Sequence, residues 1–277
     1  REYRVMDALK DTDVPVPKMI VHCDDPEIIG AEFFIMEHVE GRIIVSPAMP
    51  PVARQDRQPL AFSMVETLAS LHKVDWQSVG LEGFGRPENY LSRQTARWTA
   101  QYEGAKSDLP ADFDYSDMDW LRDWLAERAG VADESAIAHG DFRLGNLVVH
   151  PTEPRVIAVL DWELSTLGHP IADLAYMCLA YHQPPEFLGG YDMVEEGLPT
   201  EEEILSFYCE KTGRTAVPDW PVFLAFACFR SAAIIQGVAA RAAMGNVSSN
   251  SVDPAINSAR ARQVAEIGVA IARQGHS

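Results

Sequence analysis

The stretch His139–Asp173, HGDFRLGNLVVHPTEPRVIAVLDWELSTLGHPIAD, decides the fold of this 277-residue chain. Two short β-rich runs within it, Asn146–His150 and Arg155–Leu160, are joined by a Pro-Thr-Glu-Pro turn, which is typical of a β-hairpin. Because a hairpin brings its two ends together, the polar residues before the first run and after the second are expected to share one cleft.

Three oxygen-bearing side chains lie at those two ends. Asp141 and Asn146 are five residues apart on the loop that leads into the first run, and Asp161 follows the second run, 20 residues beyond Asp141. A carboxylate and an amide oxygen are ligands that Mg²⁺ takes alongside phosphate oxygens. A further aspartate nearby can orient an attacking hydroxyl and accept its proton. These are the parts that phosphoryl transfer requires.

Each of these residues also has a structural interpretation. Asp141 follows Gly140 and suits a turn, and Asn146 follows Gly145 and suits left-handed backbone. Asp161 at a strand end suits the cap of a following helix. Their joint spacing, with a hairpin between them, favours the chemical interpretation.

The motifs HGDFRLGN and DWE resemble the catalytic loop and metal-binding motif of the aminoglycoside phosphotransferase and choline kinase superfamily. The resemblance implies an α+β, protein-kinase-like fold with two lobes and a reaction that uses ATP and Mg²⁺. By this resemblance, Asp141 is the catalytic base. Asn146, Asp161 and Glu163 are the expected metal ligands, and Arg143 is expected to contact the nucleotide.

Two further residues of the same stretch have structural roles by this resemblance. His139 is expected to pack beneath the catalytic loop and hold it. Asp173, in the sequence ADLA, is expected to accept backbone N–H groups that fix this loop.

The resemblance extends to the N-terminal part of the chain. The sequence MEHVEG follows a predicted strand and looks like the linker whose backbone meets the adenine ring, so Met36, Glu37 and Val39 are expected to bind the nucleotide. Glu2, in a short predicted helix, matches the glutamate that pairs with the phosphate-binding lysine. The glycine-rich loop and that lysine would lie before Glu2, since Lys10 and Lys18 fall after the helix. We expect the chain to be part of a longer product that contains them.

Over essentially its whole length, including GRPENY and RQTARW, the chain resembles the branch that is fused to acyl-CoA dehydrogenase-like enzymes in animals and stands alone in bacteria. This resemblance implies a small-molecule hydroxyl acceptor, such as a hydroxyacyl metabolite. An aminoglycoside-type or choline-type acceptor is the alternative within the kinases. A non-catalytic pseudokinase or binding module is the alternative outside them, and a hydrolase ranks last because no GxSxG motif is present.

The order of predicted elements divides the chain into a partial N-lobe, residues 1–40, and a C-lobe, residues 41–277. The N-lobe is expected to hold a helix over Arg1–Leu9 and two antiparallel strands over Lys18–Cys23 and Ala31–Val39. Apolar residues at helical spacing predict the helices of the C-lobe: Leu60–His72, Arg93–Tyr102, Met118–Ala129, Glu201–Lys211, Pro221–Met244 and Ser258–Gln274.

Composition restricts the partners and the compartment. A formal net charge of −18 argues against nucleic-acid binding, which needs a basic face. The four cysteines contain no CxxC pair, which suits a reduced, cytoplasmic protein. The apolar segment Trp220–Met244 is interrupted by Arg230, Gln236 and Arg241, so we expect a buried helix there and no membrane span. The oligomeric state and the choice between ATP and GTP stay open.

Overall fold

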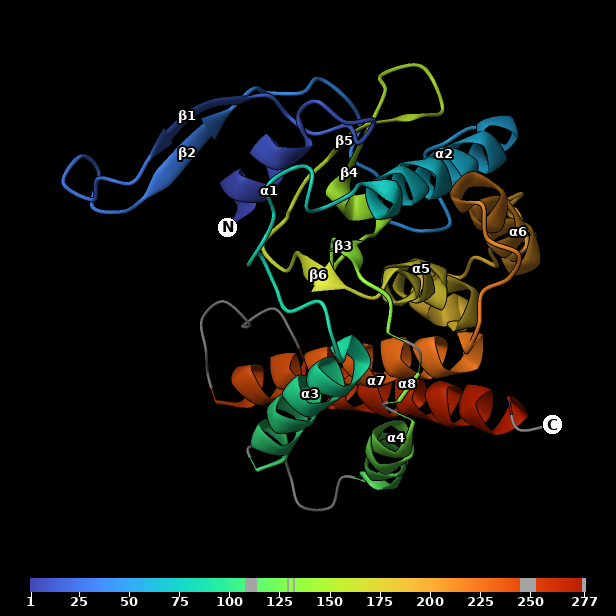
Figure 1. Cartoon of the computed structure of the whole chain (residues 1–277). Helices are drawn as coiled ribbons and strands as arrows, with labels where there is room; N and C mark the ends of the chain where they lie inside the picture. The colour runs from blue at the N-terminus through green and yellow to red at the C-terminus, as the bar shows by residue number, and fades with distance from the viewer. Residues whose placement is uncertain (108–113, 129, 132, 245–252, 276–277) are drawn as a thin grey trace. The chain divides into compact units, whose positions relative to one another are not determined.

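The structure, a computed structural model, describes residues 1–107, 114–128, 130–131, 133–244 and 253–275. Its described part is mainly helical, and its strands form three two-stranded sheets (Figure 1). The predicted α+β composition, with a large helical part, is therefore confirmed.

Each of two compact units is built from two separate stretches of the chain. Unit 1 contains Arg1–Pro87 and Ser135–Val217, and unit 2 contains Glu88–Glu134 and Pro218–Ser277. The expected boundary between an N-lobe and a C-lobe after residue 40 cuts the chain only once, whereas each of these units combines two stretches of it. The boundary therefore stays a prediction.

The N-terminal elements of unit 1 have the predicted order. Helix α1 (Glu2–Leu9) is followed by strands β1 (Met19–Cys23) and β2 (Phe33–Met36), which pair antiparallel. The ring of Tyr3 on α1 stacks on the ring of His22 on β1, with 4.2 Å between their centroids. The helix is thereby held against one strand of the hairpin.

The predicted hairpin at the centre of unit 1 is confirmed. Strands β4 (Leu147–Val149) and β5 (Val156–Val159) pair antiparallel. Each strand also bonds to a more N-terminal segment, since Val149 exchanges two hydrogen bonds of 2.7 and 2.9 Å with Arg42, and Val159 N–H donates to the Pro15 carbonyl over 2.8 Å. The hairpin is therefore fixed to two N-terminal segments of the chain.

A long helix packs beside this hairpin, and a shorter helix packs on that long helix. Helix α2 (Arg54–Lys73) ends as predicted but begins before the expected Leu60, because residues 54–58 are all polar and do not show the helical period. Helix α6 (Glu201–Thr212) begins in a capping box formed by Thr200 and Glu203. These two helices contact each other in unit 1.

Three short elements of unit 1 were not predicted: β3 (Ala136–Ala138), β6 (Thr166–Gly168) and α5 (Pro170–Cys178). The two strands pair with each other and contain three residues each, too few to show an alternating pattern. Helix α5 is buried on most sides, so its sequence lacks an amphipathic stripe. Its start does carry a signal, because Pro170 occupies the first turn and the His169 side chain caps the Ile171 N–H.

Unit 2 consists of four helices within the described residues: α3 (Tyr90–Lys106), α4 (Ser116–Glu127), α7 (Trp220–Ala243) and α8 (Pro254–Gln274). All four predicted helices are confirmed, although Ala129, the expected end of α4, lies outside the described residues. Helices α7 and α8 lie side by side along most of their lengths (Figure 1).

Helix α7 is long and apolar enough to cross a membrane by length and composition. In the structure, 72% of its most apolar window is buried. It packs against α3, α4 and α8. The burial matches the expectation of a core helix.

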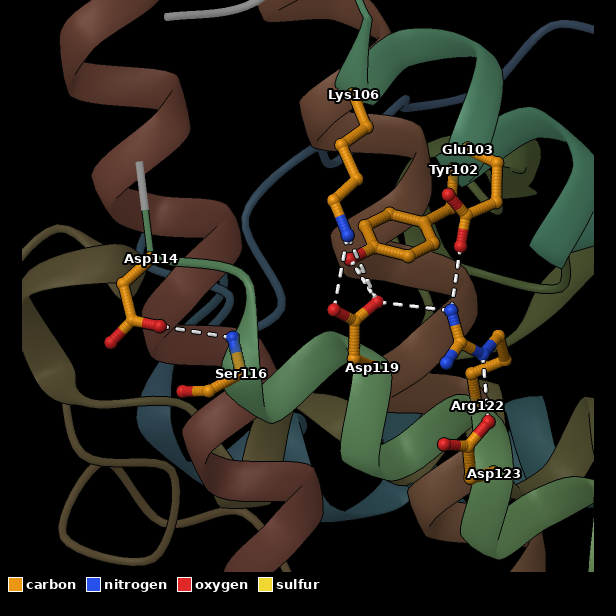
Figure 2. Close-up of polar contacts among 8 residues, drawn as sticks. All are labelled: Tyr102, Glu103, Lys106, Asp114, Ser116, Asp119, Arg122 and Asp123. Atoms are coloured by element: carbon orange, nitrogen blue, oxygen red, sulfur yellow. Dashed lines mark hydrogen bonds and ion pairs between the residues drawn. The ribbon is translucent and has the colours of Figure 1, made fainter. Parts of the chain in front are cut away.

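A polar network joins α3 to α4 in unit 2 (Figure 2). The carboxylate of Asp119 accepts hydrogen bonds from the Tyr102 hydroxyl at 2.7 Å, from Lys106 Nζ at 3.0 Å and from Arg122 Nη1 at 3.0 Å. Burial opposes the ionisation of Asp119, but the hydrogen bonds from Tyr102 and Lys106 outweigh it and lower the pKa of this carboxyl. Burial, followed by the hydrogen bond to Asp119, raises the pKa of Tyr102.

Candidate active site

The loop between β3 and β4 is held from below by Asp173 on α5. One carboxylate oxygen of Asp173 accepts the His139 N–H at 2.6 Å, and the other accepts the Gly140 N–H at 3.0 Å. The side chain is fully buried, and burial alone would raise its pKa. The nearby His72 ring, together with the N–H of His139, nevertheless lowers the pKa of Asp173. The expected role of Asp173 as an acceptor for the loop backbone is confirmed.

His139 connects this loop to the end of β5. Its Nδ1 accepts the Asp141 N–H at 3.2 Å, and its Nε2 lies 3.0 Å from the Leu160 carbonyl oxygen. An accepting Nδ1 and a carbonyl at Nε2 require the neutral tautomer with hydrogen on Nε2. Burial lowers the pKa of His139, which also favours the neutral ring. The predicted packing of His139 beneath the loop is therefore confirmed.

Gly140 allows the loop to approach the DWE turn closely. Its φ is +83°, and a Cβ at this position would lie 2.6 Å from the Leu164 carbonyl oxygen. Both the left-handed backbone and the short distance exclude other residues without rearrangement. The two loops therefore meet backbone to backbone.

Asp141 and Asn146 contact each other directly. The Asn146 amide nitrogen donates to the Asp141 carbonyl oxygen at 2.9 Å and to Asp141 Oδ2 at 2.7 Å. Because two acceptors face this nitrogen, the orientation of the amide is fixed and its oxygen points elsewhere. Arg143 Nε also lies 3.1 Å from Asp141 Oδ2. Among the described residues, Asp141 Oδ1 accepts no hydrogen bond.

Asp161 is brought to the same place by the hairpin. The Leu160 N–H donates to the Asn146 carbonyl oxygen at 2.9 Å, so Asp161 directly follows a residue that is paired with Asn146. Trp162 is fully buried, its Nε1 donates to the Val159 carbonyl at 3.0 Å, and the carboxylates on either side of it, Asp161 and Glu163, are exposed. The structure therefore places Asp141, Asn146 and Asp161 on joined segments.

The structural interpretations of Asn146 and Asp161 are not supported. The backbone of Asn146 is not left-handed, whereas the backbone of Asp161 is, with a φ of +65°. The element after Asp161 is a strand, β6, and no helix begins there. Neither residue has the local role that its position alone suggests.

The chemistry of these side chains fits a Mg²⁺ ion. Since the Asn146 amide nitrogen is committed to Asp141, its Oδ1 is the atom available to a cation. Together with the exposed carboxylates of Asp161 and Glu163 it offers only oxygen ligands, which this hard cation prefers. Within the described ranges, no group of three or more His, Cys, Asp or Glu side chains is arranged to hold a metal ion. The ligand set therefore stays a prediction.

The residues expected to contact the nucleotide lie in and after β2. Met36 ends this strand, and its side chain is exposed. The Glu37 N–H donates to the Lys18 carbonyl and the Glu37 carboxylate accepts the Lys18 N–H, both at 2.9 Å. Val39 follows after the end of the strand. These contacts give the segment a fixed path, and its nucleotide-binding role stays a prediction.

Glu2 begins α1, close to the turn that carries Glu163. The Arg1 guanidinium donates to the Ser165 carbonyl at 2.8 Å and to the Phe84 carbonyl at 2.9 Å. The start of α1 is therefore fixed to a residue two positions after Glu163. The expected pairing of Glu2 with a lysine stays a prediction.

His72 and Tyr208 support the site, and sequence reasoning did not find this pair. His72 near the end of α2 is buried; its Nδ1 lies 2.7 Å from the Tyr208 hydroxyl on α6, and its Nε2 lies 3.6 Å from Asp173 Oδ2. The sequence LASLH marks the end of a helix, but no local pattern predicts a partner 136 residues away. The catalytic loop is thus connected through Asp173 to both α2 and α6.

Comparison with known proteins agrees with this geometry. A sequence model of a family described as "Phosphotransferase enzyme family" matches residues 1–205. Acyl-CoA dehydrogenase family member 11 of Pongo abelii is 45% identical over 256 residues, which cover 90% of this chain and 32% of the relative. The chain therefore spans about a quarter to a third of the length of the curated relatives that it matches.

Solved structures show the same fold. A Ralstonia eutropha JMP134 protein with the provisional name aminoglycoside phosphotransferase is 43% identical, with a TM-score of 0.88 over 99% of this chain and 82% of that one. Aminoglycoside phosphotransferase APH(4)-Ia, in a ternary complex with AMP-PNP and hygromycin B, is 13% identical, with a TM-score of 0.60 over 96% and 83% of the two chains. The predicted kinase-like fold and superfamily resemblance are confirmed.

Proposed function

Because the chain belongs to the phosphotransferase enzyme family, whose model covers residues 1–205, we propose that it transfers the γ-phosphate of ATP to a hydroxyl group of a small molecule. The observation that carries this proposal is the hydrogen bonding of Asp141. One of its carboxylate oxygens is held by Asn146, its backbone N–H is held by His139, and its Oδ1 accepts no hydrogen bond from the described residues. A carboxylate held in this way with one open oxygen suits a general base.

In the proposed reaction, Asp141 orients the acceptor hydroxyl and accepts its proton. The hydroxyl oxygen forms a bond to the γ-phosphorus, and the bond between that phosphorus and the bridging oxygen breaks, so ADP leaves with the electron pair. Asp173 and His139 act indirectly, because they hold the backbone on which Asp141 lies. Positioning of this kind accounts for much of the rate enhancement in phosphoryl transfer.

Asn146, Asp161 and Glu163 would hold Mg²⁺, which when bound neutralises charge on the phosphates. Arg143, Glu2 and the segment containing Met36, Glu37 and Val39 would contact the nucleotide. The complex of APH(4)-Ia with AMP-PNP supports the use of ATP by a protein of this fold.

For the acceptor we favour a hydroxyacyl thioester. The chain is 45% identical to a segment of a protein named for acyl-CoA dehydrogenases, whereas the solved aminoglycoside and macrolide phosphotransferases below 25% identity share only the fold. The net charge of −18 supports a protein that does not bind nucleic acid. We also propose that the protein is cytoplasmic and does not associate with membranes.

An acceptor panel with Mg²⁺ and γ-³²P-labelled ATP tests this proposal. Hydroxyacyl-CoA compounds should become labelled, and the matching acyl-CoA compounds without the hydroxyl are the control and should not. Labelling of an aminoglycoside or of choline instead would overturn the hydroxyacyl thioester as the acceptor but would support phosphate transfer to a hydroxyl group. Nucleotide binding without transfer to any member of the panel would support the pseudokinase alternative.

A further inference from the structure

Arg143 lies on the catalytic carboxylate. Its Nε is 3.1 Å from Asp141 Oδ2, the same oxygen that accepts the Asn146 amide N–H at 2.7 Å. The side chain of Arg143 is 48% exposed, whereas that of Asp141 is 17% exposed. An ion pair with one largely solvated partner contributes little to stability, so this contact is easily exchanged for a stronger one.

Gly145 provides the space that this position of Arg143 requires. A Cβ on Gly145 would lie 2.5 Å from Arg143 Nη1 and would meet no other residue within 4 Å. The φ of Gly145 is outside the positive range, so the backbone does not demand glycine here. The missing side chain therefore serves the guanidinium of Arg143, which folds back over the loop to reach Asp141.

A terminal phosphate is a better partner for this guanidinium than Asp141. It carries more charge than a carboxylate, and arginine binds phosphate oxygens through two parallel hydrogen bonds. Asp141 does not need Arg143 to keep its position, because Asn146 and His139 hold its side chain and its backbone.

We propose that Arg143 is a movable phosphate ligand, stored on Asp141 in the absence of nucleotide and transferred to the γ-phosphate when nucleotide binds. This inference rests on the proposed function. In the stored state the guanidinium neutralises the carboxylate that must accept the hydroxyl proton. Once Arg143 has moved, Asp141 is released to accept that proton, while the oxygen–phosphorus bond forms and ADP leaves. The arrival of the phosphate is thereby coupled to the release of the base.

Binding measurements on two variants test the two halves of this proposal. Calorimetry in Mg²⁺ gives the affinities of the protein for ADP and for AMP-PNP, which differ by the terminal phosphate group. Arg143→Gln should reduce the preference for AMP-PNP over ADP about tenfold to a hundredfold, the value of a charge-assisted hydrogen bond. Gly145→Ala displaces the guanidinium from its stored position but keeps the arginine, so the preference should be retained and the affinity for AMP-PNP should equal or exceed that of the unsubstituted protein.

Matched controls come from exposed positions. Arg155→Gln removes an exposed arginine that pairs with Glu153, and Gly104→Ala adds a Cβ that meets nothing within 4 Å. Both should leave the two affinities unchanged.

An unchanged preference in Arg143→Gln would overturn the phosphate-ligand role and leave Arg143 as a partner of Asp141 alone. A weakened AMP-PNP affinity in Gly145→Ala would overturn the stored position. If the unsubstituted protein bound neither nucleotide, the proposed function itself would fail, and this inference would fall with it.

Discussion

Asp173 in unit 1 and Asp119 in unit 2 are both aspartates at the centre of a polar network, and both have a lowered pKa. Their surroundings differ, because the Asp173 side chain is 1% exposed and the Asp119 side chain is 36% exposed. Asp173 accepts two backbone N–H groups, whereas Asp119 accepts hydrogen bonds from the side chains of Tyr102, Lys106 and Arg122. Buried backbone donors fix the path of a loop, while side-chain donors, of which Lys106 and Arg122 are partly exposed, link two helices.

The largest effect is expected from Asp173→Ala. The change leaves two N–H groups of the catalytic loop without an acceptor in a buried place, and His72 without its neighbouring carboxylate. Removing one partner of a buried charged network costs about 3 to 5 kcal/mol. The free energy of unfolding, measured with urea, should fall by that amount and phosphate transfer should be lost. A loss below about 1 kcal/mol would show that Asp173 and Asp119 are equivalent.

Gly140→Ala should have the next largest effect. The new Cβ would meet the Leu164 carbonyl at 2.6 Å, at a φ of +83°. Gly30 is the matched control, since it has a φ of +89° and no atom within 4 Å of a new Cβ. Both variants should lose about 1 kcal/mol from the unfavourable backbone, and Gly140→Ala should lose about 1 to 3 kcal/mol more. Equal losses in urea unfolding would mean that the two loops are not in close contact.

A falling pH should weaken the buried network of His139 and Asp173 before it affects the partly exposed network of Asp119. Burial lowers the pKa of His139 below the ordinary 6.5, so the unfolded chain binds a proton at a pH where the folded protein does not. The stability from neutral His139 is therefore complete above pH 6.5 and is lost as the pH falls below it. Asp173 and Asp119 lose their contributions only as the pH falls below about 3.8.

NMR titration of the His139 ring checks this order. The imidazole should still be neutral at pH 6.5, with hydrogen on Nε2, while the free energy of unfolding declines as the pH falls below 6.5. A midpoint at or above pH 6.5 for the folded protein would contradict the account of this network.

The smallest effect is expected from Asp119→Asn. Its partners Lys106 and Arg122 are partly exposed, and solvent screens exposed ion pairs. The free energy of unfolding should fall by about 0.5 to 1 kcal/mol, and the difference from the unsubstituted protein should shrink as salt is added. A loss as large as that of Asp173→Ala would remove the distinction between the two networks.

The same contrast explains what could be predicted from the sequence. The β4–β5 hairpin, which joins the segment of Asp141 and Asn146 to the segment of Asp161, was predicted because it depends on a local turn. The role of Asp173 was found through a family resemblance. The contact between His72 and Tyr208 was missed because it joins helices far apart in the chain, and α5 was missed because a helix buried on most sides has no amphipathic period.

The most direct test of the central claim is the rate of phosphate transfer in Asp141→Ala. Asp7→Ala is the control, because Asp7 lies on the surface of α1 in a pair with Lys10. If Asp141 is the base, kcat with Mg²⁺, ATP and the acceptor should fall at least about a hundredfold, while the free energy of unfolding changes little. A kcat within about twofold of the unsubstituted protein would contradict the assignment of Asp141, because general-base catalysis contributes far more than that.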